Sequence, residues 1–235
     1  MKRHLTITAV AVAALGLLLA ACNDDSGDGG SAAEAADSSA PTEAAAPTGP
    51  PHLVGAQTPL DPGTYRLSFL TTSGTQPPDA TLELPRGYVD GDEWYVLSED
   101  GDQFLGLSTV KRLGRDACHP RRNELVDPGP SVQALADALA AQRATDASPP
   151  RRVTLAGHDG VYLELTGPRD ITGCHPDPEL WVGRGIYGNR QVDLVWILDV
   201  DGQRVVVDAG YDGSSTGPAE VEELRSMVDS LTFLT

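Results

Sequence analysis

Basic residues are scarce in this chain. Its 235 residues include 17 Lys and Arg against 34 Asp and Glu, so the formal net charge is −17. A protein that binds nucleic acid needs a basic surface to displace counterions from the phosphate backbone, so this charge balance argues against a nucleic-acid partner. Aromatic residues make up only 5% of the chain, but apolar residues reach 40%, which is enough for a packed core.

Familiar catalytic motifs are also missing. The sequence contains no H-E-x-x-H and no G-x-x-x-x-G-K-[ST] phosphate-binding loop. Acids are so numerous that some pair of carboxylates will lie close together by composition alone, so their number does not itself indicate catalysis. A non-catalytic protein is therefore the preferred interpretation, and catalysis stays open.

A long apolar run lies near the N-terminus. It extends from Leu5 to Ala20 behind a positive head made by Lys2 and Arg3, and it contains no charged residue. At about 1.5 Å per residue it spans about 24 Å, which is short of the roughly 30 Å hydrocarbon core of a bilayer. We therefore expect residues 1–21 to be a signal peptide and not a permanent membrane span.

The apolar run ends in Leu19-Ala20-Ala21-Cys22, which resembles the lipobox of bacterial lipoproteins. The resemblance implies that the Cys22 thiol receives a diacylglyceryl group and that a peptidase cuts the chain before Cys22. Two acyl chains give stable anchoring, since each buried methylene contributes about 0.8 kcal/mol. We therefore expect the protein at the cell membrane, lipid-anchored on the extracytoplasmic side. An ordinary secretory signal that ends in a chance cysteine is the alternative.

Residues 22–51 are expected to be the lipidated cysteine and a disordered acidic tether. After Cys22 the segment consists mainly of Ala, Ser, Gly and Pro, and it has no aromatic residue and no Val, Ile, Leu or Met. Such a composition cannot bury enough apolar surface to offset the entropy of ordering. Residues 52–235 hold all the aromatic residues and are long enough for one core, so we expect a single globular domain there.

The predicted domain combines strand and helix patterns. The dipeptide Asp201-Gly202 predicts a tight hairpin, because both central residues of a type I′ turn need a positive φ. Apolar residues at helical spacing predict a helix over 132–144 with Ser131 as its N-cap, and Gly217-Pro218 predicts the start of a second helix. Short β-rich segments predict strands at 65–71, 80–84, 94–97, 103–110, 152–155, 161–165, 191–200 and 203–211.

These elements predict an α+β fold, in which two main amphipathic helices pack on one face of an antiparallel sheet. The order of the elements, with pieces such as Leu84-Pro85-Arg86-Gly87-Tyr88, resembles the PsbP-like fold of some actinobacterial lipoproteins such as the LpqN family. The resemblance covers most of residues 58–235 and implies a lipid-anchored or secreted module. It brings no catalytic residues with it.

Cys118 and Cys174 remain as an even pair once Cys22 is assigned to lipid. In an oxidising compartment such a pair predicts a disulfide. Each of the two is followed by His and Pro, so two thiolates and two imidazoles could instead form a tetrahedral zinc set. Adjacent residues of an extended chain point to opposite sides, and the spacing matches no zinc finger. We therefore expect the disulfide, and no metal or other cofactor.

Within the predicted globular domain, aspartate precedes glycine at five positions. Closely spaced carboxylates suit calcium, but the EF-hand spacing is absent. Asp-Gly is also the pair that a turn with positive φ requires, so calcium stays open beside a purely conformational role. The five pairs begin at Asp90, Asp100, Asp159, Asp201 and Asp212.

The sequence therefore favours a lipid-anchored envelope module that binds a small apolar ligand or an envelope protein without catalysis. A hydrolase on the secreted side, using carboxylates of the acidic domain, is the alternative. Trp181 is a candidate for the rim of a pocket, and the other ligand-binding residues cannot be assigned. A sizeable apolar pocket would favour ligand binding, two buried carboxylates with shifted pKa values in a cleft would favour catalysis, and a flat apolar patch would favour a protein partner.

Overall fold

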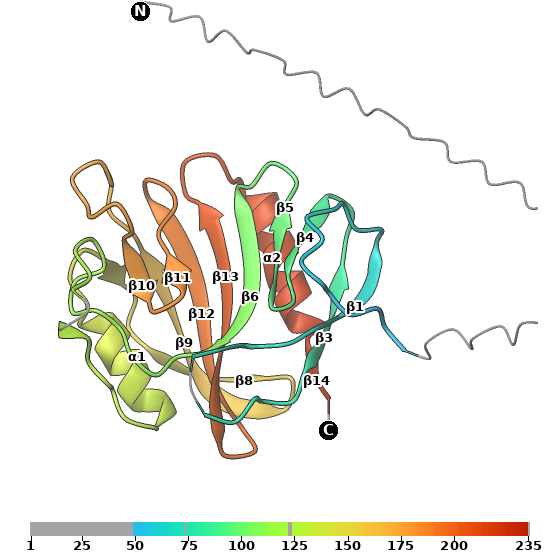
Figure 1. Cartoon of the computed structure of the whole chain (residues 1–235), viewed down its shortest axis with the longest axis horizontal. Helices are drawn as coiled ribbons and strands as arrows, with labels where there is room; N and C mark the ends of the chain where they lie inside the picture. Colours follow the sequence, from blue (N-terminus) through green and yellow to red (C-terminus); the bar gives the residue numbers. More distant parts are fainter. Residues whose placement is uncertain (1–48, 73, 122–123, 235) are drawn as a thin grey trace, which may run out of the picture. The chain divides into compact units, whose positions relative to one another are not determined.

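The structure is a computed structural model that describes residues 49–72, 74–121 and 124–234 (Figure 1). Cys22 and residues 1–48 lie outside the described residues, so the signal peptide, the lipidation and the tether stay predictions. Strands account for 42% of the structure and helices for 12%. The fold is therefore mainly antiparallel β.

A nine-stranded sheet is the largest element in the described part of the chain. Its strands are β2 (Leu70–Thr71), β4 (Tyr88–Asp92), β5 (Tyr95–Ser98), β6 (Gln103–Thr109), β7 (Asp146–Ala147), β8 (Arg151–Leu155), β9 (His158–Thr166), β12 (Gln191–Val200) and β13 (Gln203–Asp212). Seven of them follow the order β4-β5-β6-β13-β12-β9-β7, while β2 pairs with β6 and β8 pairs with β9. The β2–β6 pair is parallel, and the others are antiparallel.

Two smaller sheets and two helices complete the fold over the described residues (Figure 1). The three-stranded sheet has the order β1-β3-β14, from β1 (Gly63–Leu67), β3 (Ala80–Leu84) and β14 (Thr232–Phe233). The hairpin of β10 (Glu179–Trp181) and β11 (Arg184–Gly185) is the other sheet, and the helices are α1 (Val132–Ala140) and α2 (Pro218–Asp229). Neither of these helices is long and apolar enough to cross a membrane.

The hairpin between β12 and β13 confirms the prediction from Asp201-Gly202. Asp201 has a φ of 52° and Gly202 a φ of 81°, as a turn of this type requires. The register runs from Val200 opposite Gln203 to Gln191 opposite Asp212, so two long strands pair over their full length. This pair lies at the middle of the large sheet and carries much of its buried surface.

The expectation of two main helices packed together on one sheet face is wrong. The helices are short, and they belong to different core clusters. Leu135 of α1 is buried with Val195 and Val206, whereas Leu224 of α2 is buried with Val207 and its neighbours. Helix α1 contacts β9 and β12, while α2 contacts β13 and β3. The sheet therefore determines the architecture, and the helices are local additions to it.

The first helix ends four residues before the predicted end because its continuation bonds elsewhere. The Gln142 side-chain amide donates to the carbonyls of Gly114 (2.9 Å) and Leu180 (2.8 Å). The Arg143 amide donates to the carbonyl of Arg115 at 2.9 Å, and Ala144 has a φ of 67°, outside the helical region. Tertiary hydrogen bonds thus replace the last helical turn that the apolar spacing predicts.

The predicted disulfide is present between Cys118 and Cys174, with 4.7 Å between their Cα atoms. Backbone hydrogen bonds flank it: the His175 amide donates to the Cys118 carbonyl (2.8 Å), and the Glu179 amide donates to the Ala117 carbonyl (2.9 Å). The bond uses both thiols that a zinc set would need. It also ties the chain ahead of α1 to the segment that leads into β10.

We predict that reducing this disulfide lowers the free energy of unfolding by about 4 kcal/mol. The bond closes the loop from residue 118 to residue 174, and the chain-entropy model assigns about that much to a loop of this length. Urea unfolding of the oxidised and the reduced mature protein measures the difference. A variant with both Cys118→Ala and Cys174→Ala is the control, because its midpoint should not respond to reductant. Two titratable thiols in the denatured, unreduced protein would contradict the disulfide.

Candidate functional site

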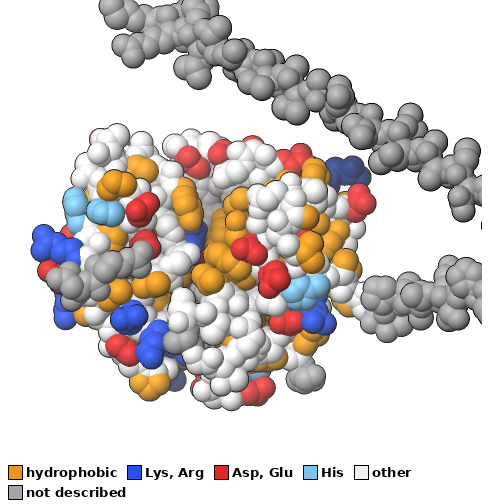
Figure 2. Space-filling view, viewed as in Figure 1, with side chains coloured by type: hydrophobic (Ala, Val, Ile, Leu, Met, Phe, Trp, Pro, Cys, Tyr) orange, Lys and Arg blue, Asp and Glu red, His pale blue; other side chains and the backbone are white. Residues whose placement is uncertain are grey.

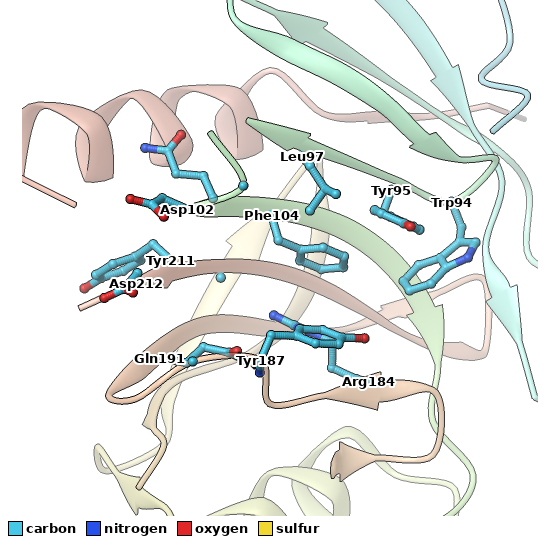
Figure 3. A pocket seen from close by; sticks show the side chains of 14 residues that line it. Trp94, Tyr95, Leu97, Asp102, Phe104, Arg184, Tyr187, Gln191, Tyr211 and Asp212 are labelled. Atoms are coloured by element: carbon cyan, nitrogen blue, oxygen red, sulfur yellow. Dashed lines mark hydrogen bonds between the residues drawn. The ribbon is translucent and has the colours of Figure 1, made fainter. Parts of the chain in front are cut away.

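A cavity of about 470 Å³ opens on one face of the large sheet. Hydrophobic side chains gather in a hollow near the middle of the face seen in Figure 2. Strands β5, β6 and β13 line one part of the cavity, and β11 and the connection to β12 line the other (Figure 3). The lining residues are Trp94, Tyr95, Leu97, Gly101, Asp102, Gln103, Phe104, Arg184, Tyr187, Gly188, Gln191, Gly210, Tyr211 and Asp212.

Strand alternation explains why polar residues lie beneath this cavity. Side chains along β13 alternate between the two faces, so Asp208 and Gly210 share the face of Val206. Val206 belongs to the core cluster that contains α1. On that face, the apolar residues of β13 end at Val206, and Asp208 is the next residue. On β12, Asp193 lies on the same face next to the apolar Val195. Both carboxylates are buried, with 2% and 1% of their surface exposed.

Arg184 lies between these two buried carboxylates. Its Nη2 donates to Asp193 Oδ1, its Nε donates to Asp208 Oδ2, and its Nη1 donates to the Gly185 carbonyl at 3.0 Å. Gln191 completes the group, because its Nε2 donates to both oxygens of Asp193, at 3.1 and 2.9 Å. The Arg184 side chain is only 3% exposed, so its positive charge is neutralised by the buried carboxylates of the protein itself.

The electrostatics of this group follow from two carboxylates sharing one cation. Burial opposes the charge of Arg184, yet Asp193 and Asp208 hold its pKa above the ordinary value. Burial raises the pKa of Asp208 from 3.8 to about 7, in spite of the attraction of Arg184, and the charge on Asp193 adds to the rise. The Oδ1 atom of Asp208 has no hydrogen-bond partner within the described residues. A proton on Asp208 would therefore relieve the excess negative charge.

Aromatic rings cover the cavity side of Arg184 (Figure 3). The guanidinium carbon lies 4.1 Å from the centroid of Phe104 and 5.8 Å from that of Tyr187. Phe104 in turn contacts Tyr95 and Trp94, with ring centroids 5.3 and 5.9 Å away. Tyr187 stands out because 78% of its surface is exposed. One side of the cavity is thus formed by packed aromatic rings, those of Trp94, Tyr95 and Phe104, and the other side carries the exposed ring of Tyr187.

Gly210 makes room for the arginine. A Cβ atom at this position would lie 2.4 Å from Nη2 of Arg184 and 2.8 Å from Oδ1 of Asp193. Contacts that short do not occur, so any side chain here would displace the guanidinium. Gly106, the partner of Asp208 in the β6–β13 register, makes room for Phe104 in the same way, since its Cβ would lie 2.5 Å from that ring.

Two further carboxylates lie at one end of the cavity. Asp102 ends the turn before β6, and Asp212 ends β13, with the Asp212 amide donating to the Asp102 carbonyl at 2.9 Å. The Ser215 hydroxyl donates to Asp102 at 2.6 Å, and the Ser214 amide donates to Asp212 at 2.7 Å. Hydrogen bonds from the Ser214 side chain and backbone lower the pKa of Asp212, so this carboxylate stays ionised.

The residues singled out from the sequence, Trp181, Cys118 and Cys174, do not line this cavity. Trp181 is only 1% exposed and belongs to a core cluster, so it does not form the rim of this cavity. Trp94 and Tyr211 line the cavity. The disulfide of Cys118 and Cys174 lies on the approach to the hairpin that carries Arg184.

The Asp-Gly pairs serve several roles. The Asp90 carboxylate accepts hydrogen bonds from the backbone amides of Val54, Gly55 and Ala56, at 3.0 to 3.1 Å. These amides form an anion-binding loop whose anion is the Asp90 carboxylate itself, so its oxygens face N–H donors and not a cation. Asp212 lies at the cavity. Across the ranges that the structure describes, no three His, Cys, Asp or Glu side chains come together as metal ligands would.

Sequence reasoning missed Arg184, Asp193, Asp208 and Tyr187. A faint signal existed, because Asp193 and Asp208 interrupt two otherwise apolar strands at positions where alternation expects an apolar residue. Charged residues at buried positions of central strands call for a buried partner. Arg184 lies in a short, glycine-flanked segment without a strand pattern, so nothing in the sequence identifies it as that partner.

No protein-family model matches the chain, and no curated protein matches it. Among solved structures the chain is similar to the solution structure of cyanobacterial PsbP (CyanoP) from Synechocystis sp. PCC 6803. The TM-score is 0.32 and the identity 12%, over 66% of this chain and 86% of that chain. The PsbP-like fold, LpqN-type membership and the lipobox stay predictions. A similarity this weak transfers no function.

We predict that Asp208 makes folding stability fall as the pH rises from about 4 to about 7. Its folded pKa is raised from 3.8 to about 7, so in this window the folded protein holds a proton that the unfolded chain has lost. The stabilisation is complete below the unfolded pKa and is lost as the pH rises through the folded one. In Asp208→Asn, the amide resembles the protonated acid, so this fall should disappear.

Urea midpoints of the wild type and of Asp208→Asn across that pH window measure the effect. Asp199→Asn is the control, because Asp199 lies exposed at the far end of β12. If the urea midpoints of the wild type and of Asp208→Asn change with pH in parallel, Asp208 does not have a raised pKa in the folded protein.

Proposed function

We propose that this protein is a non-catalytic binding module that holds a small organic ligand in the aromatic cavity on the outer side of a cell membrane. The observation that carries the proposal is the cavity itself. Its volume of about 470 Å³ is in the range of small-molecule sites, and aromatic side chains supply much of its lining. A few polar groups, those of Gln191, Asp102 and Asp212, lie beside this apolar surface.

The arrangement of the acids favours binding over hydrolysis. Asp193 and Asp208 are buried and bonded to Arg184, and neither belongs to the lining of the cavity. A general acid that works near neutral pH needs a raised pKa and access to the substrate. Asp212 has access but a lowered pKa, whereas Asp208 has a raised pKa but no access. Neither of these two acids therefore combines a raised pKa with access to the cavity.

The proposed location rests on the sequence and on the disulfide. The N-terminal pattern that ends in Cys22 is the reason to propose lipid anchoring. The bond between Cys118 and Cys174 supports a compartment outside the reducing cytoplasm. An acidic tether would hold the binding domain away from an anionic membrane surface, since like charges repel over a Debye length of about 8–10 Å.

Binding in the cavity predicts that Tyr187→Ala weakens ligand retention by about 2- to 12-fold. Tyr187 is an exposed ring at the cavity, and an aromatic contact contributes about 0.5–1.5 kcal/mol beyond its buried area. Native mass spectrometry of the protein purified from its own envelope measures the bound fraction. Val54→Ala is the matched control, since Val54 is a similarly exposed apolar residue (68%) outside the cavity.

Equal bound fractions in wild type and Tyr187→Ala would argue against this cavity as the binding site. A wild-type protein that carries no small molecule and gains none from envelope extract would remove the proposed function altogether. Retention of an intact protein partner in both variants would point to the second expectation, an envelope protein.

The lipid anchor makes a separate prediction. Cys22→Ser should move the protein from the membrane fraction to the soluble extracytoplasmic fraction, because serine cannot receive the thioether-linked diacylglyceryl group. Fractionation followed by immunodetection measures this, with the double variant Cys118→Ala and Cys174→Ala as a control that removes the other two cysteines and keeps Cys22. Membrane retention of the Cys22→Ser protein would contradict the prediction that a lipid on Cys22 anchors the protein.

A further inference from the structure

We infer that the cavity selects an organic cation: a flat apolar or aromatic group that carries one ammonium, and not the anion of the same shape. The inference rests on the proposed binding function and specifies the charge of its ligand. It follows from where the charges around the cavity lie and from which of them are already neutralised.

Arg184 is not available to an anionic ligand. Each of its three nitrogen atoms donates a hydrogen bond within the protein, to Asp208, Gly185 and Asp193. The face of its guanidinium is covered by Phe104 at 4.1 Å. Two carboxylates surround this one cation, so the buried group has no surplus positive charge to offer. Of the residues lining the cavity in the described structure, Arg184 is the only Lys or Arg.

The carboxylates of Asp102 and Asp212, at one end of the cavity, form no ion pair with a Lys or Arg among the residues that the structure describes. The partners found for Asp102 and Asp212 are serine hydroxyls and backbone amides, which orient a carboxylate but leave its charge in place. Oδ2 of Asp212 lies near Gly188, another residue of the lining, since a Cβ atom built on Gly188 would be 3.7 Å from it. Two formal negative charges thus remain next to Tyr211 at this end (Figure 3).

The opposite end of the cavity is aromatic. Trp94 and Tyr95 lie there, with Phe104 between them and Arg184 (Figure 3). Aromatic faces carry negative potential and attract organic cations, with about 0.5–1 kcal/mol at exposed sites and about 2 or more where water is excluded. The same faces accept a flat apolar group by stacking. One end therefore suits a ring and the other a positive charge, and both ends disfavour an anion.

Three probes of nearly equal shape test this inference. Benzyltrimethylammonium is the cation, neopentylbenzene is its neutral isostere, and phenylmethanesulfonate is the anion. Titration of each into the folded domain, followed through the indole N–H resonance of Trp94, gives the affinity at this cavity. We expect the cation to bind about 10-fold more tightly than the neutral probe, which corresponds to about 1.4 kcal/mol, and the anion to leave the resonance unshifted.

Paired variants separate charge from structure. Asp212→Asn keeps an oxygen that can accept from Ser214 but removes the charge, so it should weaken the cation about 10-fold and leave the neutral probe unchanged. Asp199→Asn is the matched control. Asp199 is the penultimate residue of β12, and its carboxylate also accepts a backbone hydrogen bond in a turn, from the amide of Gly202 at 2.8 Å. It lies at the end of β12 that is remote from the cavity.

A neutral or anionic probe that binds as tightly as the cation would overturn the inference, as would an Asp212→Asn protein with unchanged cation affinity. In those cases binding in the cavity would still stand. Failure of all three probes to shift the Trp94 resonance would also overturn it, and the retention measurement on Tyr187→Ala would then decide separately whether the cavity binds any ligand.

Discussion

The buried bridge from Arg184 to Asp193 and Asp208 is the interaction on which the site depends. Strands β10 and β11 are short, with three and two residues, so their own hydrogen bonds cannot hold the hairpin in place. Arg184 fixes the hairpin to two central strands of the large sheet. Removing one partner of such a bridge leaves buried charge without compensation, at about 3–5 kcal/mol. The bridge is therefore a strong constraint on position, whatever its net contribution to stability.

The disulfide and Gly210 also help to place the β10–β11 hairpin and its Arg184. Cys118 and Cys174 hold the segment that enters β10, and Gly210 leaves the space that the guanidinium fills. These features lie far apart in the sequence and have no common pattern. The disulfide was predictable from the cysteine pair alone, whereas the glycine at 210 is explained only once Arg184 is placed, because a Cβ there would collide with the guanidinium.

The parts of the fold that could be predicted from sequence are those determined by local physics. Alternation and the Asp201-Gly202 turn determine the β12–β13 hairpin, and its strand bounds agree at Gln191–Val200. The α+β expectation failed because helical spacing indicates where a helix can form but not which core cluster it joins. It also does not show where tertiary hydrogen bonds end the helix, as at Gln142. Strands β10 and β11 and the placement of Arg184 depend on partners distant in sequence, which no local pattern records.

The charge of the cavity follows from this placement and not from the composition of the chain. An arginine at a cavity would ordinarily suggest an anionic ligand, since guanidinium recognises carboxylate and phosphate. Here the protein itself supplies both carboxylates, and Phe104 covers the face of the cation. The arginine then acts as a structural cation, and the potential that a ligand meets is set by the aromatic faces and by Asp102 and Asp212. Burying the one positive charge under its own counterions is what turns an arginine-lined cavity into one suited to cations.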